Sequence, residues 1–174
     1  MKRLAASIVV SLFLLVAPLG CDKKSDSSLP ITQMQIGNET FNLEIATSSK
    51  DQEIGLMHRD HLDTDHGMIF VFPDEQVRDF WNHEVHFSLD LIFLNSAGDV
   101  VSIKLLQAWN ERSVSSDVPA KYAIELNAGT ADKIGLKVGA HLTVPPDALN
   151  PPPQPATTQT SWLNPVEYRR DCPC

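Results

Sequence analysis

Cysteine is almost missing from this chain. The 174 residues include three cysteines, Cys21, Cys172 and Cys174, all close to the two ends. The central region therefore folds without disulfides and without thiolate metal sites. The sequence also lacks a Gly-x-Ser-x-Gly nucleophile motif and a phosphate-binding loop that ends in Lys-Ser/Thr. These absences exclude the best-marked classes of serine hydrolase and nucleotide-binding protein, and no cofactor is predicted.

Basic residues are scarce. The chain has 14 Lys and Arg against 22 Asp and Glu, which gives a net charge of −8. Removal of residues 1–20 would take away Lys2 and Arg3 and leave a net charge of −10. A body of this charge repels the phosphates of nucleic acids, and no basic stripe offsets that repulsion. We therefore expect no nucleic-acid partner.

The sequence has one long apolar run, and it lies at the N-terminus. Leu4–Ala17 is 14 residues long and follows Lys2 and Arg3. A membrane-spanning helix needs about 20 apolar residues, so this run is too short. A positive start followed by a short apolar stretch is typical of a secretory signal peptide. Residues 1–20 are therefore predicted to be such a peptide.

The predicted signal peptide ends in Leu19-Gly20-Cys21, which resembles a bacterial lipobox. In that motif the chain is cut before the cysteine, and the cysteine carries the lipid. Pro18 departs from the leucine-like residue that is usual three positions before the cysteine. An ordinary signal peptide with an incidental cysteine, or an uncleaved anchor, is the alternative. We expect lipidation of Cys21 and an extracytoplasmic, membrane-anchored protein on the periplasmic side of the inner or outer membrane.

A polar tether, residues 21–30, connects the predicted anchor to a region with the pattern of short β-strands. Apolar residues alternate on both sides of Gly37-Asn38, which is typical of a β-hairpin, and Asn95–Asp99 separates two further strands. Pro73 is expected to end a strand. The predicted strands are Met34–Ile36, Phe41–Ile45, Met68–Phe72, Asp79–Asn82, Leu89–Leu94, Val100–Leu105, Tyr122–Leu126 and Leu142–Val144.

Two short helical segments accompany the strands. Ser48 and Ser49 precede a predicted helix over Lys50–Met57, and Thr130 is expected to cap one helical turn that ends near Gly135. The pattern predicts a mostly β fold over residues 31–146. We expect a small antiparallel β-barrel or sandwich with one or two short helices.

The composition changes after residue 146. Eight of the twelve prolines lie in Pro145–Cys174, and Asn150 begins a polyproline-like spacer. Residues 147–174 are therefore predicted to be a flexible tail. The tail ends in Cys172-Pro173-Cys174, which could form an intermolecular disulfide, bind a soft metal or have no role.

Five of the six histidines fall between His58 and His86. His58, His61 and His66 stand among aspartates, and imidazole with carboxylate is a ligand set that suits zinc. The segment is a predicted loop without a His-x-x-x-His helical pair. A solvated polar loop is the better explanation, and no metal site is predicted.

The second group of polar residues lies in or beside apolar segments. Asp90 interrupts Leu-Asp-Leu-Ile-Phe-Leu, and Glu125 interrupts Ala-Ile-Glu-Leu. A carboxylate in a buried strand must be paired, hydrogen-bonded or turned toward a cavity. Three interpretations stay open: an internal salt bridge to Arg59 or Lys121, a binding pocket, or catalysis by paired carboxylates on a glycan. The candidate ligand-binding residues are Arg59, Trp81, Glu84, Asp90 and Glu125.

A series of short motifs resembles, in order and spacing, the Domain of Unknown Function 192 family over residues 42–144. The resemblance implies a small, mostly β domain and brings no catalytic residues. Glu84-Val85 and Ser88 replace an Asn-Thr pair and a proline that the family usually has. The motifs are Glu44-Ile-Ala-Thr47, Gly55-Leu-Met57, His58-Arg-Asp-His-Leu62, Gly67-Met-Ile-Phe-Val-Phe-Pro73, Phe80-Trp81, Leu89-Asp-Leu-Ile-Phe93, Gly98-Asp-Val-Val-Ser-Ile103, Pro119-Ala120, Ile124-Glu-Leu-Asn-Ala-Gly129 and Gly135-Leu-Lys-Val-Gly139.

The sequence thus predicts a membrane-anchored binding or accessory module at the cell envelope. The membrane would be reached through the lipid anchor, and the ligand could be a glycan or an envelope protein. An envelope enzyme that acts on a glycan through Asp90, Glu125 or Glu84 is the alternative.

Overall fold

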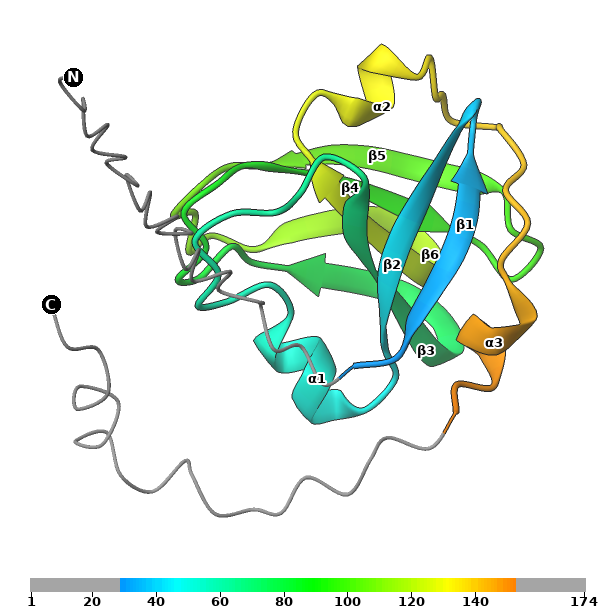
Figure 1. The fold of residues 1–174 in the computed structure, drawn as a ribbon, viewed down its shortest axis with the longest axis horizontal. Helices are drawn as coiled ribbons and strands as arrows, with labels where there is room; N and C mark the ends of the chain where they lie inside the picture. Colours follow the sequence, from blue (N-terminus) through cyan, green and yellow to red (C-terminus); the bar gives the residue numbers. More distant parts are fainter. Residues whose placement is uncertain (1–28, 153–174) are drawn as a thin grey trace, which may run out of the picture.

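The computed structural model describes residues 29–152 (Figure 1). The predicted signal peptide, Cys21, Cys172 and Cys174 lie outside these residues. Within the described part, no helix is long and apolar enough to cross a membrane. The elements are β1 (Ile31–Ile36), β2 (Glu39–Ala46), α1 (Ser49–Ile54), β3 (His66–Phe80), β4 (Leu89–Leu94), β5 (Val100–Leu106), β6 (Val114–Asn127), α2 (Thr130–Lys133) and α3 (Pro146–Leu149).

The described strands form one six-stranded sheet in the order β1-β2-β3-β6-β4-β5. The predicted mostly β fold is confirmed, as are the hairpins β1–β2 and β4–β5. The sheet is mixed rather than wholly antiparallel because β2 and β3 run parallel. α1 lies in the connection that parallel pairing requires. The edge strands β1 and β5 do not pair with each other, so a closed barrel is not formed and a sandwich-like arrangement fits better.

The central strands β3 and β6 are longer than predicted, with 15 and 14 residues. Pro73 does not end β3: the register with β6 shifts between Val71 and Gln76, and the strand continues to Phe80. Proline lacks the N–H that ladder pairing needs, and a bulge is where a strand tolerates it. The second half of β3 stays paired with β6, and its residues 77–80 form one wall of a pocket.

Both faces of the sheet are covered. One hydrophobic cluster joins Met34, Phe41 and Ile124 with Leu136, Leu142 and other residues of the C-terminal segment. A second cluster on the opposite face includes Met68, Phe70, Leu91, Phe93 and Leu56. All six residues of β4 are buried, because its side chains enter the two clusters alternately.

The helical segments differ in how they are held. Ser48 caps α1 as predicted, since its Oγ accepts the Asp51 N–H at 3.1 Å. No residue of α1 is buried, and the Gln52 side chain ties the helix to the sheet through the carbonyls of Ala46 (3.2 Å) and Val71 (3.0 Å). Gly55 ends α1 with φ +50°, a conformation that favours glycine.

The C-terminal segment departs from the predicted pattern in three places. The N-cap of α2 is Gly129, not Thr130. Leu142–Val144 does not form a strand, and only an isolated bridge joins His141 to Asp99. The fold extends beyond residue 146, because α3 buries Ala148 completely and the Thr32 hydroxyl donates to Asp147 at 2.8 Å.

Candidate functional site

A cavity of about 340 Å³ lies on the face of the sheet that carries Met68 and Phe70. Its walls come from α1 and the residues that follow it, from the end of β3 and from the loop after β3, with one residue of β6. The lining residues that the argument uses are Met57, Phe70, Phe72, Phe80, Trp81 and Glu125.

Aromatic side chains dominate this cavity. Phe80 packs edge-on against Phe70, Phe72 and Phe93, with ring centroids 5.0, 6.3 and 5.6 Å away. The Arg78 guanidinium lies 4.0 Å from the centroid of the Phe72 ring. Trp81 stands at the end of this wall with 53% of its surface exposed. The result is an apolar recess with a partly exposed indole beside it.

Glu125 is the unusual residue of the cavity. It is 4% exposed and makes no hydrogen bond or salt bridge within residues 29–152, and because no fully enclosed side-chain oxygen there lacks a partner, its carboxyl group keeps some access to the cavity. It also lines the cavity, so its carboxyl group can reach a molecule bound there. Burial raises the pKa of Glu125 to about 8, and the positive charge of Arg59 opposes the rise. The side chain therefore carries a proton in most molecules at pH 7.

A second buried carboxylate, Glu44, lies on the same face of the sheet. Glu44 is the direct partner of Met68 on β3, and Met68 is the direct partner of Glu125 on β6. Residues directly opposite one another share a face. Glu44 and Glu125 therefore flank Met68 in one row, with two strand spacings of about 4.8 Å each between them.

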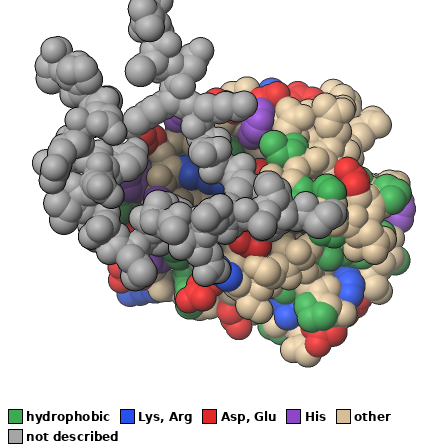
Figure 2. Space-filling view, turned by 60° about the horizontal axis from the view of Figure 1, so that its bottom comes forward, with side chains coloured by type: hydrophobic (Ala, Val, Ile, Leu, Met, Phe, Trp, Pro, Cys, Tyr) green, Lys and Arg blue, Asp and Glu red, His purple; other side chains and the backbone are tan. Residues whose placement is uncertain are grey.

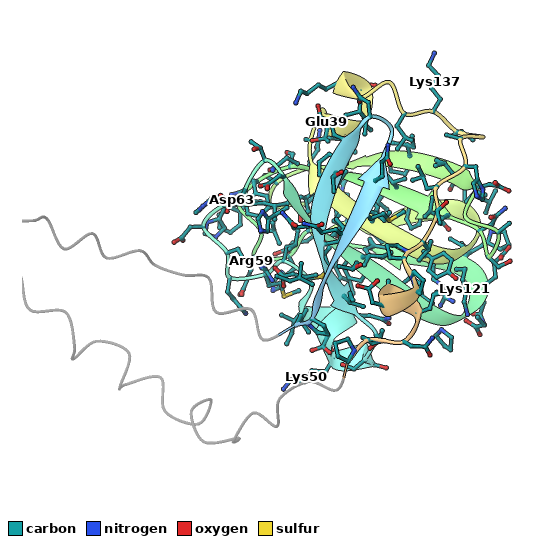
Figure 3. All side chains as sticks on the ribbon, turned by 45° about the vertical axis from the view of Figure 1, so that its right-hand side comes forward. Glu39, Lys50, Arg59, Asp63, Lys121 and Lys137 are labelled. Atoms are coloured by element: carbon teal, nitrogen blue, oxygen red, sulfur yellow. The ribbon has the colours of Figure 1, made fainter. Side chains whose placement is uncertain are left out.

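Arg59 neutralises Glu44. Its guanidinium forms a two-pronged pair with Glu44, in which Nη1 contacts Oε1 and Nη2 donates to Oε2 at 2.8 Å. The two side chains are 17% and 6% exposed. Figure 3 shows Arg59 on the same side of the molecule as Asp63 and far from Lys121. Lys121 instead donates to the Pro73 carbonyl at 2.7 Å, so of the two predicted salt-bridge partners only Arg59 lies near Glu125.

Three loop residues beside the cavity have strained backbones. His58, Glu84 and Trp109 have φ values of +63°, +52° and +58°. The backbone N–H of His58 donates to the Glu84 carbonyl at 3.4 Å, and the His58 Nδ1 lies 3.0 Å from a carboxylate oxygen of Glu84. Positive φ in non-glycine residues is costly and concentrates at functional sites. Glu84 is thus fixed in the rim loop rather than in the cavity wall.

Asn82 holds that rim loop in place. It is 1% exposed, and its Nδ2 donates to the carbonyls of Phe87 (3.0 Å) and Gln107 (2.8 Å). Its backbone N–H donates to the Asn110 carbonyl at 2.8 Å. These bonds tie the two loops at this end of the sheet together, so the position of Trp81 next to Asn82 is set by buried contacts.

Asp90 lies on the other face of the sheet. Its direct partner on β6 is Leu126, whose neighbour Glu125 points the opposite way. The Asp90 carboxylate accepts the backbone N–H of Gly129 at 3.1 Å and of Ala131 at 2.7 Å. It therefore holds the start of α2, and the structure does not bring Asp90 and Glu125 together as a carboxylate pair.

Asp90→Ala is expected to lower the free energy of unfolding by about 1–3 kcal/mol, because the buried N–H of Ala131 and the partly buried N–H of Gly129 lose their acceptor. Urea denaturation measures the change. Asp147→Asn is the matched control, since it also removes one negative charge but keeps an oxygen for the Thr32 hydroxyl. An Asp90→Ala protein as stable as the control would contradict the assigned role.

The five predicted site residues are thus divided. Trp81 and Glu125 line the cavity, and Arg59 acts on Glu125 by its charge. Glu84 belongs to the rim, and Asp90 lies on the other face of the sheet. Sequence reasoning missed Glu44 and the phenylalanine wall. Glu44 was missed because it alternates with apolar residues, and this pattern indicates a solvent-facing position when only one face of the sheet is buried. Its place within Phe-Asn-Leu-Glu-Ile-Ala could have revealed it, because an acid within an apolar run is the signal that identified Glu125.

The histidines considered as zinc ligands have separate carboxylate neighbours. His61 lies 3.4 Å from Asp63, and His66 lies 2.9 Å from Asp65. Between residues 29 and 152, no three His, Cys, Asp or Glu side chains are grouped in a way that could hold a metal ion.

Comparison with known proteins places the chain among uncharacterised relatives. The model of the family described as DUF192, uncharacterized ACR, matches residues 32–144, more than half of the chain. No curated protein matches.

Two crystal structures resemble the fold, each with 28% identity over 66% of this chain. One is from Sinorhizobium meliloti 1021 and is described as a candidate transcription regulator, with a TM-score of 0.61 and 92% of its chain covered. The other, from Novosphingobium aromaticivorans DSM 12444, is a protein of unknown function with a TM-score of 0.60 and 84% covered.

Proposed function

The chain belongs to the DUF192 family, and on that premise we propose that it is a membrane-anchored, extracytoplasmic module that binds a small ligand in the cavity beside α1. The family is described as uncharacterised and supplies no reaction. The proposal therefore rests on this chain's own residues.

The observation that carries the binding function is the buried Glu125 carboxyl group, which forms no hydrogen bond or salt bridge within the described residues and lines a cavity with an aromatic wall. Burial of a polar group without a hydrogen-bond partner lowers stability by about 1–3 kcal/mol. A residue with a purely structural role at this position would not need a carboxyl group. Apolar walls with a few placed polar groups are the usual composition of small-molecule sites. A volume of about 340 Å³ suits one ring or a short alkyl chain.

The start of the described chain determines where an anchored domain would sit. Leu29 packs against the same hydrophobic cluster that floors the cavity, and the Pro30 carbonyl accepts the Ile45 N–H at 2.8 Å. Figure 1 shows β1 beginning beside α1. With lipid on Cys21, residues 22–28 extend to about 25 Å at most. The cavity would then work close to the membrane surface.

Other functions find less support. The Asp90–Glu125 pair that a glycan hydrolase could have used is not formed, because Asp90 faces away from Glu125. Transcription regulation, the role for which one structural relative is a candidate, finds no support in the charge of this chain, because a net charge of −8 repels nucleic acid. On the visible part of the face in Figure 2, Lys and Arg side chains are scattered and form no continuous basic surface.

One experiment with two parts tests the proposed function. The wild-type chain should fractionate with membranes, and Cys21→Ser should be released in soluble form. The purified soluble variant should bind benzyl alcohol, a neutral probe of suitable size, in a calorimetric titration. Adding Met57→Trp, which fills the cavity, should weaken binding at least about tenfold, whereas Val138→Trp at an exposed position outside it should not. Unchanged fractionation refutes the anchor, and equal binding by the two tryptophan variants refutes the pocket.

A further inference from the structure

We propose that the ligand of this cavity is a small organic cation with an apolar body, held by the aromatic wall and the carboxylate of Glu125. The inference rests on the proposed binding function and specifies its ligand class. An amine or a quaternary ammonium group belongs to this class.

The buried charges on this face of the sheet would be balanced by one additional cation. Glu44 and Arg59 cancel each other through their two-pronged contact. Glu125 then contributes one negative charge that no described side chain neutralises when the group is ionised. A cation placed against Glu125 would complete the row without adding an unpaired charge, and buried charges are stable only when paired.

The remaining charged groups near the cavity do not compete for Glu125. Arg78 is held by Asp74 at 2.5 Å and by the Phe72 ring, and Lys104, on the same face two strands away, contacts Asp117. His83 lies 3.7 Å from Glu84 and 3.5 Å from Glu111. The other ionisable lining residues are the acids Glu53 and Asp79.

The aromatic wall favours a cation with carbon substituents. Phe70, Phe72, Phe80 and Trp81 all line the cavity, and ring faces attract cations, most strongly with tryptophan. The wall already makes this kind of contact once, between Arg78 and Phe72 at 4.0 Å. A metal ion needs several oxygen ligands, and Glu125 offers it one buried carboxylate. An alkylammonium group can contact both the aromatic rings and Glu125.

Binding of a cation is then coupled to loss of the Glu125 proton. At pH 7 the free cavity holds the protonated acid, because burial raises its pKa to about 8. The arriving cation favours the carboxylate, so the proton leaves to solvent. A neutral ligand does not favour the carboxylate over the protonated acid. It can accept a hydrogen bond from the protonated acid, so its binding releases no proton.

The test uses benzyltrimethylammonium, a permanent cation, with benzyl alcohol as the neutral probe, in calorimetric titrations of the soluble Cys21→Ser chain from pH 6 to 9. The affinity for the cation should rise about tenfold per pH unit up to about pH 8 and then level off, with release of close to one proton below pH 7. The affinity for benzyl alcohol should not rise over this range.

Glu125→Gln should remove the pH dependence and at least about tenfold of the cation affinity at pH 8.5, while benzyl alcohol still binds. His83→Gln is the matched control, since histidine is the other residue type that changes charge near neutral pH, and it should keep the wild-type slope. A cation slope that survives in Glu125→Gln, or a cation weaker than benzyl alcohol at every pH, overturns the inference and leaves the binding function intact. Failure of both probes overturns the binding function itself.

Discussion

Replacement of Glu125 by Gln is expected to stabilise the domain increasingly as the pH rises from 5 to 8. The pKa of Glu125 is about 8 in the folded protein, against an ordinary value of 4.5. Below the ordinary value the acid is protonated in both states and adds no pH-dependent cost. Between the two values the unfolded chain ionises freely while the folded chain holds the proton, so unfolding becomes easier with each pH unit. The stability that Glu125 contributes is therefore present at acid pH and lost through pH 8.

The size of this effect follows from linkage. Each pH unit within the window removes up to about 1.4 kcal/mol, which sums to several kcal/mol across it. Glutamine has the same shape and no charge to bury, so its protein should not show this loss. Urea denaturation of both proteins at pH 5, 6, 7 and 8 measures the difference, and groups common to the two cancel in that difference. A parallel pH dependence in both proteins would contradict the assignment.

A control separates Glu125 from other carboxylates. Glu53 is an exposed acid in the same cavity wall, and Glu53→Gln should preserve the wild-type slope. Asp65 and Asp99 have pKa values lowered by their hydrogen bonds with His66 and His141. Their contribution has the opposite sign, because it is lost as the pH falls below the ordinary range of aspartate. The window from pH 5 to 8 therefore belongs to Glu125 among these acids.

Loss of the Arg59 side chain is the second large expected effect. Arg59→Met should lower the free energy of unfolding by about 3–5 kcal/mol at pH 7, because Glu44 stays buried without its neutralising partner. The variant should also raise the pKa of Glu125 further, since Arg59 opposes that rise. Denaturation curves give the stability, and the shift of the pH window described above reports the pKa.

The double variant Glu44→Gln/Arg59→Met separates the effect of the lost charge from the effect of the lost side-chain volume. Removal of both charges should recover at least about half of the loss, because the cost comes from a buried carboxylate that has lost the Arg59 charge rather than from missing side-chain volume. Arg112→Met, at an exposed position, should change stability by less than about 0.5 kcal/mol. A single variant no less stable than the double variant would show that the pair contributes nothing.

Local signals predicted the parts of the fold that depend on neighbouring residues. Gly37 and Gly98 both have positive φ in the turns of the two predicted hairpins, and Ser48 caps α1 as expected. Such features are fixed within a few residues of chain. The parallel pairing of β2 and β3 is fixed by packing between distant segments, so the strand pattern alone could not reveal it.

The same distinction explains the site. Glu125 and Arg59 were recognised because a charge in or near an apolar run needs a reason. Asp90 gave the same signal but serves backbone N–H groups that a different helix presents. Pro73 was taken as the end of a strand, and the aromatic wall beyond it could be found only once β3 was known to continue through a bulge to Phe80. The face on which a residue lies also required the pairing registers.

The way α1 is attached has a consequence for exchange between the cavity and solvent. This helix forms part of the cavity wall, buries none of its own residues and is tied to the sheet by the Gln52 side chain. Segments with few buried apolar contacts open at much lower free energy than the whole domain. α1 can therefore swing away while the sheet stays folded. Ligand arrival and departure would then depend on this local opening and not on unfolding of the whole domain.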